Sequence, residues 1–182
     1  MKIHIYFFIK TLFFITIAHA NPSQGQWKQY LYTDGISSNY TFHTHKDNKS
    51  RVWIGTQNGI TLIDGLEIKK FGSEHGLPST DITFINSIGE DVYVATSNKR
   101  IYKFNGIGKF EKTDIVKGNK IHSMENINGK LFVSTNLENV MYDGVNVSFM
   151  QNSFPKAEIK DVFQYNGETW FVSEDQIIKK KN

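Results

Sequence analysis

The chain alternates short apolar segments with polar turns, and one apolar pattern recurs about every 39 residues. Each copy has an aromatic residue in its second position and ends in Thr or Ser. The copies are residues 52–56, 92–96, 131–135 and 169–173. Short runs of β-branched and aromatic residues bounded by turns are typical of strands, and no segment shows a helical period long enough to compete. The pattern therefore predicts an all-β protein.

Turn residues and a second set of aromatic residues keep the same phase. An Asp-Gly or Asn-Gly pair, which is typical of a type I′ hairpin turn, follows the first three copies at Gly65, Gly106 and Gly144. Phe71, Phe110 and Phe149 end these units at intervals of 39 residues. Each unit is thus expected to be a four-stranded antiparallel meander. The aromatic residues of the recurring strand are interpreted as packing residues rather than as a sugar-stacking surface. They are Trp53, Tyr93, Phe132 and Trp170.

Four-stranded units repeated at this interval predict a β-propeller, because each sheet in such a ring buries both faces against its neighbours. The repeats are expected at about 33–71, 72–110, 111–149 and 150–182. An open solenoid is the structural alternative, but its repeats usually carry fewer strands. The expected fold is therefore a β-propeller of about four four-stranded antiparallel blades.

The two ends of the chain bear on whether this ring closes. Residues 27–32 resemble an isolated fourth strand, because Tyr30 stands five residues before a glycine, as Phe71 does. The last repeat stops near Ile178, after only three strands. The first strand is expected to complete the last blade, or else the propeller is partial. A partial propeller would be a truncated remnant or a half-ring that forms a homodimer, and these alternatives stay open here.

Residues 1–20 are interpreted as a cleaved signal peptide, which leaves a propeller domain at 21–182. Two lysines are the only charges in this leader, and Ala18-His19-Ala20 fits the small-x-small rule for signal peptidase. Lys10 interrupts the apolar stretch, so no run there is long enough to span a bilayer. We therefore expect a periplasmic or secreted protein with no membrane span after cleavage.

Charge and cysteine content exclude several functions. The chain has 21 Lys and Arg against 18 Asp and Glu, so loss of the two leader lysines leaves 19 against 18. A nearly neutral chain without a basic stripe is not expected to bind nucleic acid. The absence of cysteine excludes disulfides, thiolate metal sites and a cysteine nucleophile.

The first repeat resembles a known family. Residues 33–39 (TDGISSN), Asp47-Asn48, 51–56 (RVWIGT) and 58–60 (NGI) are similar to the two-component regulator propeller repeat. The second copy, which begins at Glu74, is recognisable but degraded, and later copies keep only the aromatic strand and the turns. The resemblance implies a large extracytoplasmic propeller that senses ligands such as glycan fragments. In that family a membrane helix passes the signal to a kinase or a transcriptional domain.

Candidate binding residues are few. His43 and His45 lie two apart on an expected innermost strand, hence on one face, and His75 or His122 could join them as metal ligands. Because no cysteine or phased carboxylate completes a ligand set, these histidines are interpreted as polar channel or surface residues, with His43, His45 and His122 as weak ligand-binding candidates. No metal, cofactor or catalytic residue is expected, since paired catalytic carboxylates, a nucleophile elbow and a phosphate loop are missing.

The sequence therefore favours an exported, non-enzymatic binding or sensor-like propeller with a glycan or a protein as its partner. One alternative is a propeller hydrolase or lyase that acts on a glycan, which predicts clustered His and acidic residues at one channel mouth. Another is a truncated remnant of a larger sensor, which predicts an unpaired apolar edge at the C-terminal end.

Overall fold

The computed structural model describes residues 27–78, 80–150 and 157–181 as an all-β structure of four antiparallel sheets. The first sheet contains β1 (Thr41–Lys46), β2 (Val52–Thr56), β3 (Gly59–Asp64) and β4 (Glu67–Phe71). The second contains β5 (Ile82–Ile88), β6 (Asp91–Thr96), β7 (Ile101–Phe104) and β8 (Phe110–Lys112). The third contains β9 (Ile121–Ile127), β10 (Lys130–Thr135), β11 (Asn139–Tyr142) and β12 (Val147–Phe149). The fourth contains β13 (Asp161–Tyr165), β14 (Glu168–Val172) and β15 (Ile177–Lys181). The expected signal peptide lies outside the described residues.

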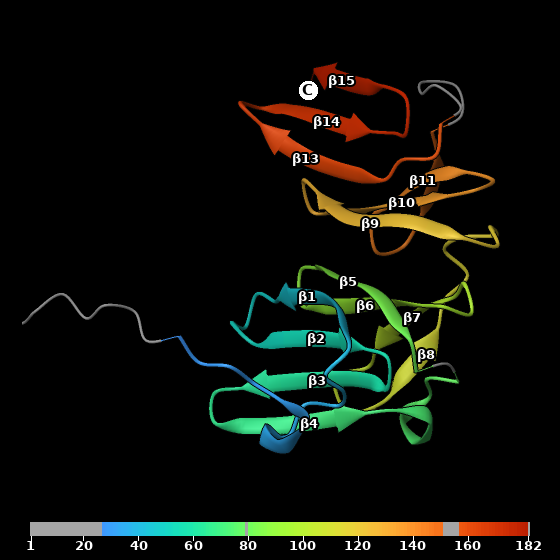
Figure 1. The fold of residues 1–182 in the computed structure, drawn as a ribbon. Helices are drawn as coiled ribbons and strands as arrows, with labels where there is room; N and C mark the ends of the chain where they lie inside the picture. Colours follow the sequence, from blue (N-terminus) through green and yellow to red (C-terminus); the bar gives the residue numbers. More distant parts are fainter. Residues whose placement is uncertain (1–26, 79, 151–156, 182) are drawn as a thin grey trace, which may run out of the picture.

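The four sheets form a fan around their first strands. Consecutive sheets contact one another through the innermost strands β1, β5, β9 and β13. Figure 1 shows the first sheet extending downward and the last sheet upward from this line of inner strands, in opposite directions. The expected propeller blades are confirmed, and they are arranged as an arc whose two end sheets do not meet.

Each pair of neighbouring sheets encloses one apolar core, and the phased aromatic residue lies at its centre. We call the face that carries this residue the leading face of its sheet, and the opposite face the trailing face. Trp53 packs against Phe71 of its own sheet and against Phe104 and Phe110 of the next, with ring centroids 5.1 to 6.4 Å apart. Tyr93 and Phe132 lie in the second and third cores. A leading face thus meets a trailing face at every junction.

The small and hydroxylated residues of the recurring strand have local causes. A Cβ on Gly55 would lie 2.8 Å from Ile82 of the next sheet, so the close approach of the second sheet favours glycine there. The hydroxyl of Thr56 donates to the carbonyl of Gly59 and accepts the N–H of Asn58, which fixes the β2–β3 turn. The equivalent residues of the other sheets make the same kind of turn contact. They are Thr96, Thr135 and Ser173.

The expected strand at residues 27–32 is wrong for the single chain. Residues 27–31 have no regular structure, and Tyr32–Asp34 forms the 3-10 helix η1. The Asp34 carboxylate accepts the N–H of Leu31, and the side chain of Asn39 accepts the N–H of Tyr32. A strand needs a neighbour for its backbone groups, and the last sheet lies at the other end of the arc. The chain therefore does not close its own ring.

Candidate functional site

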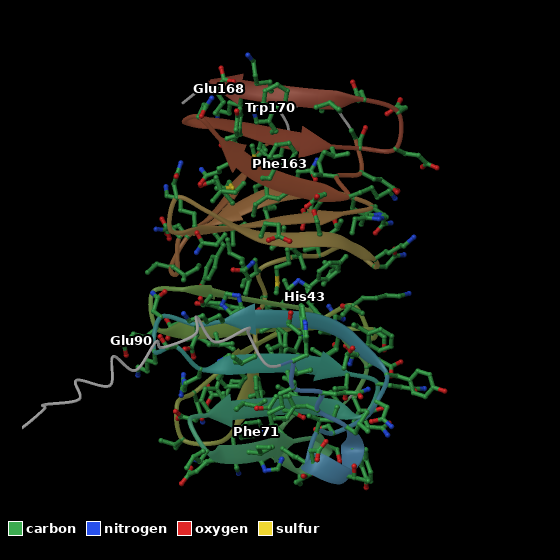
Figure 2. The ribbon with its side chains drawn as sticks, turned by 60° about the vertical axis from the view of Figure 1, so that its left-hand side comes forward. His43, Phe71, Glu90, Phe163, Glu168 and Trp170 are labelled. Carbon is green, nitrogen blue, oxygen red and sulfur yellow. The ribbon has the colours of Figure 1, made fainter. Side chains whose placement is uncertain are left out.

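Two of the candidate histidines link the innermost strands of the first two sheets. Nδ1 of His43 accepts the N–H of Ile85 at 3.3 Å, and its ring centroid lies 5.9 Å from that of Phe84. Nε2 of His45 lies 2.9 Å from the hydroxyl of Ser87. Figure 2 shows His43 where the first sheet meets the sheets above it. Burial lowers the pKa of both histidines, so both are neutral at neutral pH.

The same kind of polar link joins the second and third sheets. The side-chain amide of Asn86 donates to the carbonyl of Met124 at 3.3 Å and to Oε2 of Glu125 at 3.2 Å. Burial, together with the nearby charge of Asp161, raises the pKa of Glu125 to about 7, although the Asn86 hydrogen bond acts in the opposite direction. Glu125 therefore takes up a proton close to neutral pH. We call His43, His45, Asn86, Ser87 and Glu125 the inner-strand ladder.

The third candidate histidine belongs to a separate cluster. His122 lies in a β-bulge at the start of β9 and is buried. Its Nε2 is 3.2 Å from a carboxylate oxygen of Glu158, and its Nδ1 is 3.4 Å from Nζ of Lys160. Burial lowers the pKa of His122 despite the carboxylate. Lys160 also contacts Glu158 at 3.3 Å, so the cluster holds one carboxylate, one ammonium group and one neutral imidazole.

The histidines of the described residues are distributed over separate parts of the fold. Across the described part of the chain, no group of three or more His, Cys, Asp or Glu side chains is placed to hold a metal ion. His75 instead approaches Glu74 at 3.0 Å and stands against the ring of Phe71.

The phased aromatic residues of the first three sheets are more deeply buried than that of the last sheet. Trp53, Tyr93 and Phe132 are completely buried. Trp170 is only partly buried, because its leading face has no following sheet; its ring is parallel to that of Phe163 with centroids 6.2 Å apart. The turn glycines Gly65, Gly106 and Gly144 all have positive φ, at 60°, 81° and 102°.

Sequence reasoning missed two carboxylates. Asp47 is buried beneath its turn and accepts Trp53 Nε1 and Arg51 Nε, each at 2.8 Å, and the N–H groups of Lys49 and Arg51. The sequence feature that could have identified Asp47 is its position six residues before the phased Trp53. Glu125 pairs with Phe132 across β9 and β10, the register that His45 has with Trp53, so the repeat phase could have found it.

Solved structures with this fold include the extracellular domains of two hybrid two-component systems of B. thetaiotaomicron. One matches with a TM-score of 0.66 and 14% sequence identity, and the match covers 87% of this chain and 23% of that chain. The other matches with a TM-score of 0.64 and 16% sequence identity, and the match covers 84% of this chain and 22% of that chain. Virginiamycin B lyase of Staphylococcus aureus, in an inactive form with quinupristin, matches with a TM-score of 0.62, 13% identity, 88% of this chain and 61% of that chain.

These likenesses confirm, at the level of the fold, the expected similarity to two-component regulator propellers. The chain spans less than a quarter of either sensor domain. No family model and no curated protein matches the sequence. Within the described residues, no helix is long and apolar enough to cross a membrane.

Proposed function

We propose that this chain is an exported, non-enzymatic propeller module that binds a ligand along its innermost strands, in the manner of a sensor domain. The observation that carries the proposal is the inner-strand ladder. It places neutral imidazoles, an amide and a carboxyl that titrates near neutrality on the strands that surround a propeller axis. Such groups can donate and accept hydrogen bonds without the cost of burying a fixed charge.

The chemistry of this surface suits a glycan or a polar segment of a protein. Tyr40 and Phe42 are exposed at the start of β1, beside the polar ladder. Aromatic faces next to a few fixed polar groups are the usual composition of small-ligand sites. Export of the chain is part of the same proposal and rests on the leader-like residues 1–20 and on the extracellular domains that share the fold.

A thermal-shift screen of the exported chain against a panel of oligosaccharides tests this function. A ligand at 100 times its Kd adds about 2.7 kcal/mol to stability, which raises Tm by about 5–10 °C for a domain of this size. Phe42→Ala should abolish the shift, whereas Leu66→Ala, which removes a more exposed apolar side chain at the β3–β4 turn, should keep it. A shift that survives Phe42→Ala but disappears in Leu66→Ala would move the site away from the inner strands.

A lyase or hydrolase is the second candidate, because of the cluster of His122, Glu158 and Lys160. An imidazole beside a carboxylate and an ammonium group can accept a proton from a substrate or donate one to it. If this activity exists, incubation with a glycan panel releases new reducing ends, and His122→Ala removes that release while leaving Tm within a few degrees. Binding without any release favours the sensor-like module.

A further inference from the structure

Among the described residues, the last sheet has one strand fewer than the others and leaves β15 as an open edge. In the other sheets an outer strand, β4, β8 or β12, pairs with the strand that occupies the place of β15. β15 pairs with β14 alone in the described structure, and Ile177 at its start is 65% exposed. An unpaired edge offers a row of backbone N–H and C=O groups to another strand.

Residues 27–30 have the sequence of an outer strand. They stand 41 positions before residues 68–71 of β4, so that Trp27 corresponds to Ile68 and Tyr30 to Phe71. The backbone that follows is the same in both places: a 3-10 helix, then a glycine with positive φ, Gly35 at 104° and Gly76 at 90°. A buried apolar residue comes next in each case. These residues are Ile36 and Leu77.

Residues 27–30 therefore lead into the first sheet as β4 leads into the second, but within the single chain they have no sheet to join. The side chain of Trp27 is 100% exposed. Ser37 holds the following residues on the first sheet through Thr61, whose hydroxyl accepts its N–H at 2.7 Å. Because the first and last sheets extend in opposite directions, this segment points away from β15 of its own chain (Figure 1).

We propose that two copies of the chain assemble head to tail, with residues 27–30 of each copy pairing with β15 of the other. The β3–β4 register sets the alignment: Phe71 pairs with Ile60 and Ile68 with Ile63, which puts Tyr30 opposite Ile177 and Trp27 opposite Lys180. Each copy thereby completes the last sheet of its partner. The two arcs together give a ring of eight sheets, within the four to eight blades that propellers use.

A cleft is present where the Trp27 side chain would lie. It opens beside β15 between the last two sheets and has a volume of ≈ 220 Å³. Its lining includes Met141, Met150, Phe171 and the stem of Lys180. Unbranched thioethers adapt readily to an aromatic ring, so this lining suits an indole. The cleft lies on the trailing face of the last sheet, which is the face that Trp27 would share with Lys180.

The two end faces also complement each other. The last sheet exposes its leading face, with Phe163 and Trp170 near its outer surface (Figure 2). The first sheet exposes part of its trailing face, including Val52. Every internal junction joins one face of each kind, so the contact between copies repeats an arrangement that the fold already uses. Two-fold symmetry would form this contact twice and close the ring.

Charge is compensated at the new pair of strands. Lys28 would lie opposite Lys179, but Glu168 already neutralises Lys179 at 3.1 Å, and the ammonium group lies over the ring of Trp170 at 5.4 Å. The proposal is independent of ligand binding, because the inner-strand ladder lies on other strands.

Light scattering of the exported chain after size exclusion, over a hundredfold range of concentration, tests the assembly. We expect a dimer that Trp27→Ala and Ile177→Asp each weaken at least tenfold, with unchanged far-UV circular dichroism, because both side chains are exposed in the single chain. Leu66→Ala is the matched control and should leave the dimer intact, since Leu66 is at least as exposed as Trp27 and Ile177 but lies on the β3–β4 turn.

Cross-linking identifies the strands that pair. The chain has no cysteine, so Tyr30→Cys and Ile177→Cys introduce the only thiols. Mixing the two variants under oxidising conditions should give a disulfide-linked dimer, whereas each variant alone should give little, because pairing brings position 30 against position 177. A monomer at every concentration, a dimer insensitive to both Trp27→Ala and Ile177→Asp, or equal cross-linking in the unmixed variants would overturn the proposal.

Discussion

The buried carboxylate of Asp47 gives the sharpest test of how the first repeat is stabilised. Replacing Asp47 by Ala leaves Nε1 of Trp53 without its acceptor inside a core where Trp53 is completely buried. An unsatisfied buried donor costs about 1–3 kcal/mol. The Arg51 side chain loses a charged hydrogen bond but can still reach water, so we assign about 1 kcal/mol to it. The N–H groups of Lys49 and Arg51 in the turn also lose their acceptor. Together these losses should make Asp47→Ala destabilise the protein by about 3–4 kcal/mol.

Urea unfolding followed by Trp fluorescence measures this loss. Asp47→Asn keeps an acceptor for Trp53 and should cost only about half as much. Trp53→Phe removes the Nε1 donor, so Asp47→Ala should cost about 1–2 kcal/mol less in that background than in the parent. Asp64→Ala removes an exposed aspartate at the end of β3 and should change stability by less than about 0.5 kcal/mol. A cost for Asp47→Ala within the range of Asp64→Ala would refute the reasoning.

The pH dependence of the parent gives an independent check on Asp47. Burial alone would raise the pKa of Asp47, but the hydrogen bonds from Trp53 and Arg51 outweigh it and hold the pKa below its ordinary value of 3.8. A carboxyl with a lowered pKa stabilises the folded state above its unfolded pKa, and that contribution is lost as the pH falls through the folded value. The stability difference between the parent and Asp47→Asn should therefore be constant above about pH 5 and shrink below about pH 4.

Two further stability predictions concern the inner junctions. Glu125 has a folded pKa of about 7, above the ordinary 4.5, so the folded state binds the extra proton and the parent loses stability as the pH rises from 4.5 through 7. Because the carboxyl is partly exposed, Glu125→Gln should stabilise the protein by only about 1 kcal/mol at pH 8 and by little at pH 5, as urea unfolding at the two pH values would show; equal effects at both would contradict the raised pKa. Phe132→Ala empties the core between the last two sheets and should cost about 3–5 kcal/mol, whereas Phe149→Ala, in the same sheet but exposed, should cost less than about 1 kcal/mol in the same assay. Similar losses for the two would mean that the phased position is not the packing centre.

The repeat could be predicted from sequence because its strongest signals are local. An aromatic residue in the middle of a strand, an Asp-Gly turn and a Thr at the strand end each have a nearby cause: core burial, a positive φ, and a turn hydrogen bond. These causes recur once per blade, so they leave a period that can be read without knowing how the blades are placed. The first sheet, whose turn Asp47 supports, keeps the most of this pattern.

The behaviour of residues 27–32 could not be predicted in the same way. Their alternation is that of β4, and the backbone after them copies the chain after β4. Whether they form a strand depends on a free edge within reach, and that edge lies on the last sheet, at the far end of the arc. The local pattern therefore identifies a segment with the sequence of an outer strand, but it wrongly predicts that this segment forms a strand in the single chain. The titration of Glu125 is non-local too, since Asn86 and Asp161 reach it from other sheets.

The inner strands hold the variation that a binding module needs. The residue opposite the phased aromatic in the register of each blade is His45, Asn86, Glu125 and Phe163 in turn. The aromatic partners change only among Trp, Tyr and Phe, and in the first three sheets each fills a core between two sheets. The inner-strand position has no such requirement, so it can carry an imidazole, an amide, a carboxyl or a ring without disturbing the blade. Blade packing thus depends on the recurring strand, whereas the variable chemistry lies on the neighbouring inner strand of the same sheet. Substitutions that alter binding should therefore fall on the inner strands and leave the recurring strand unchanged.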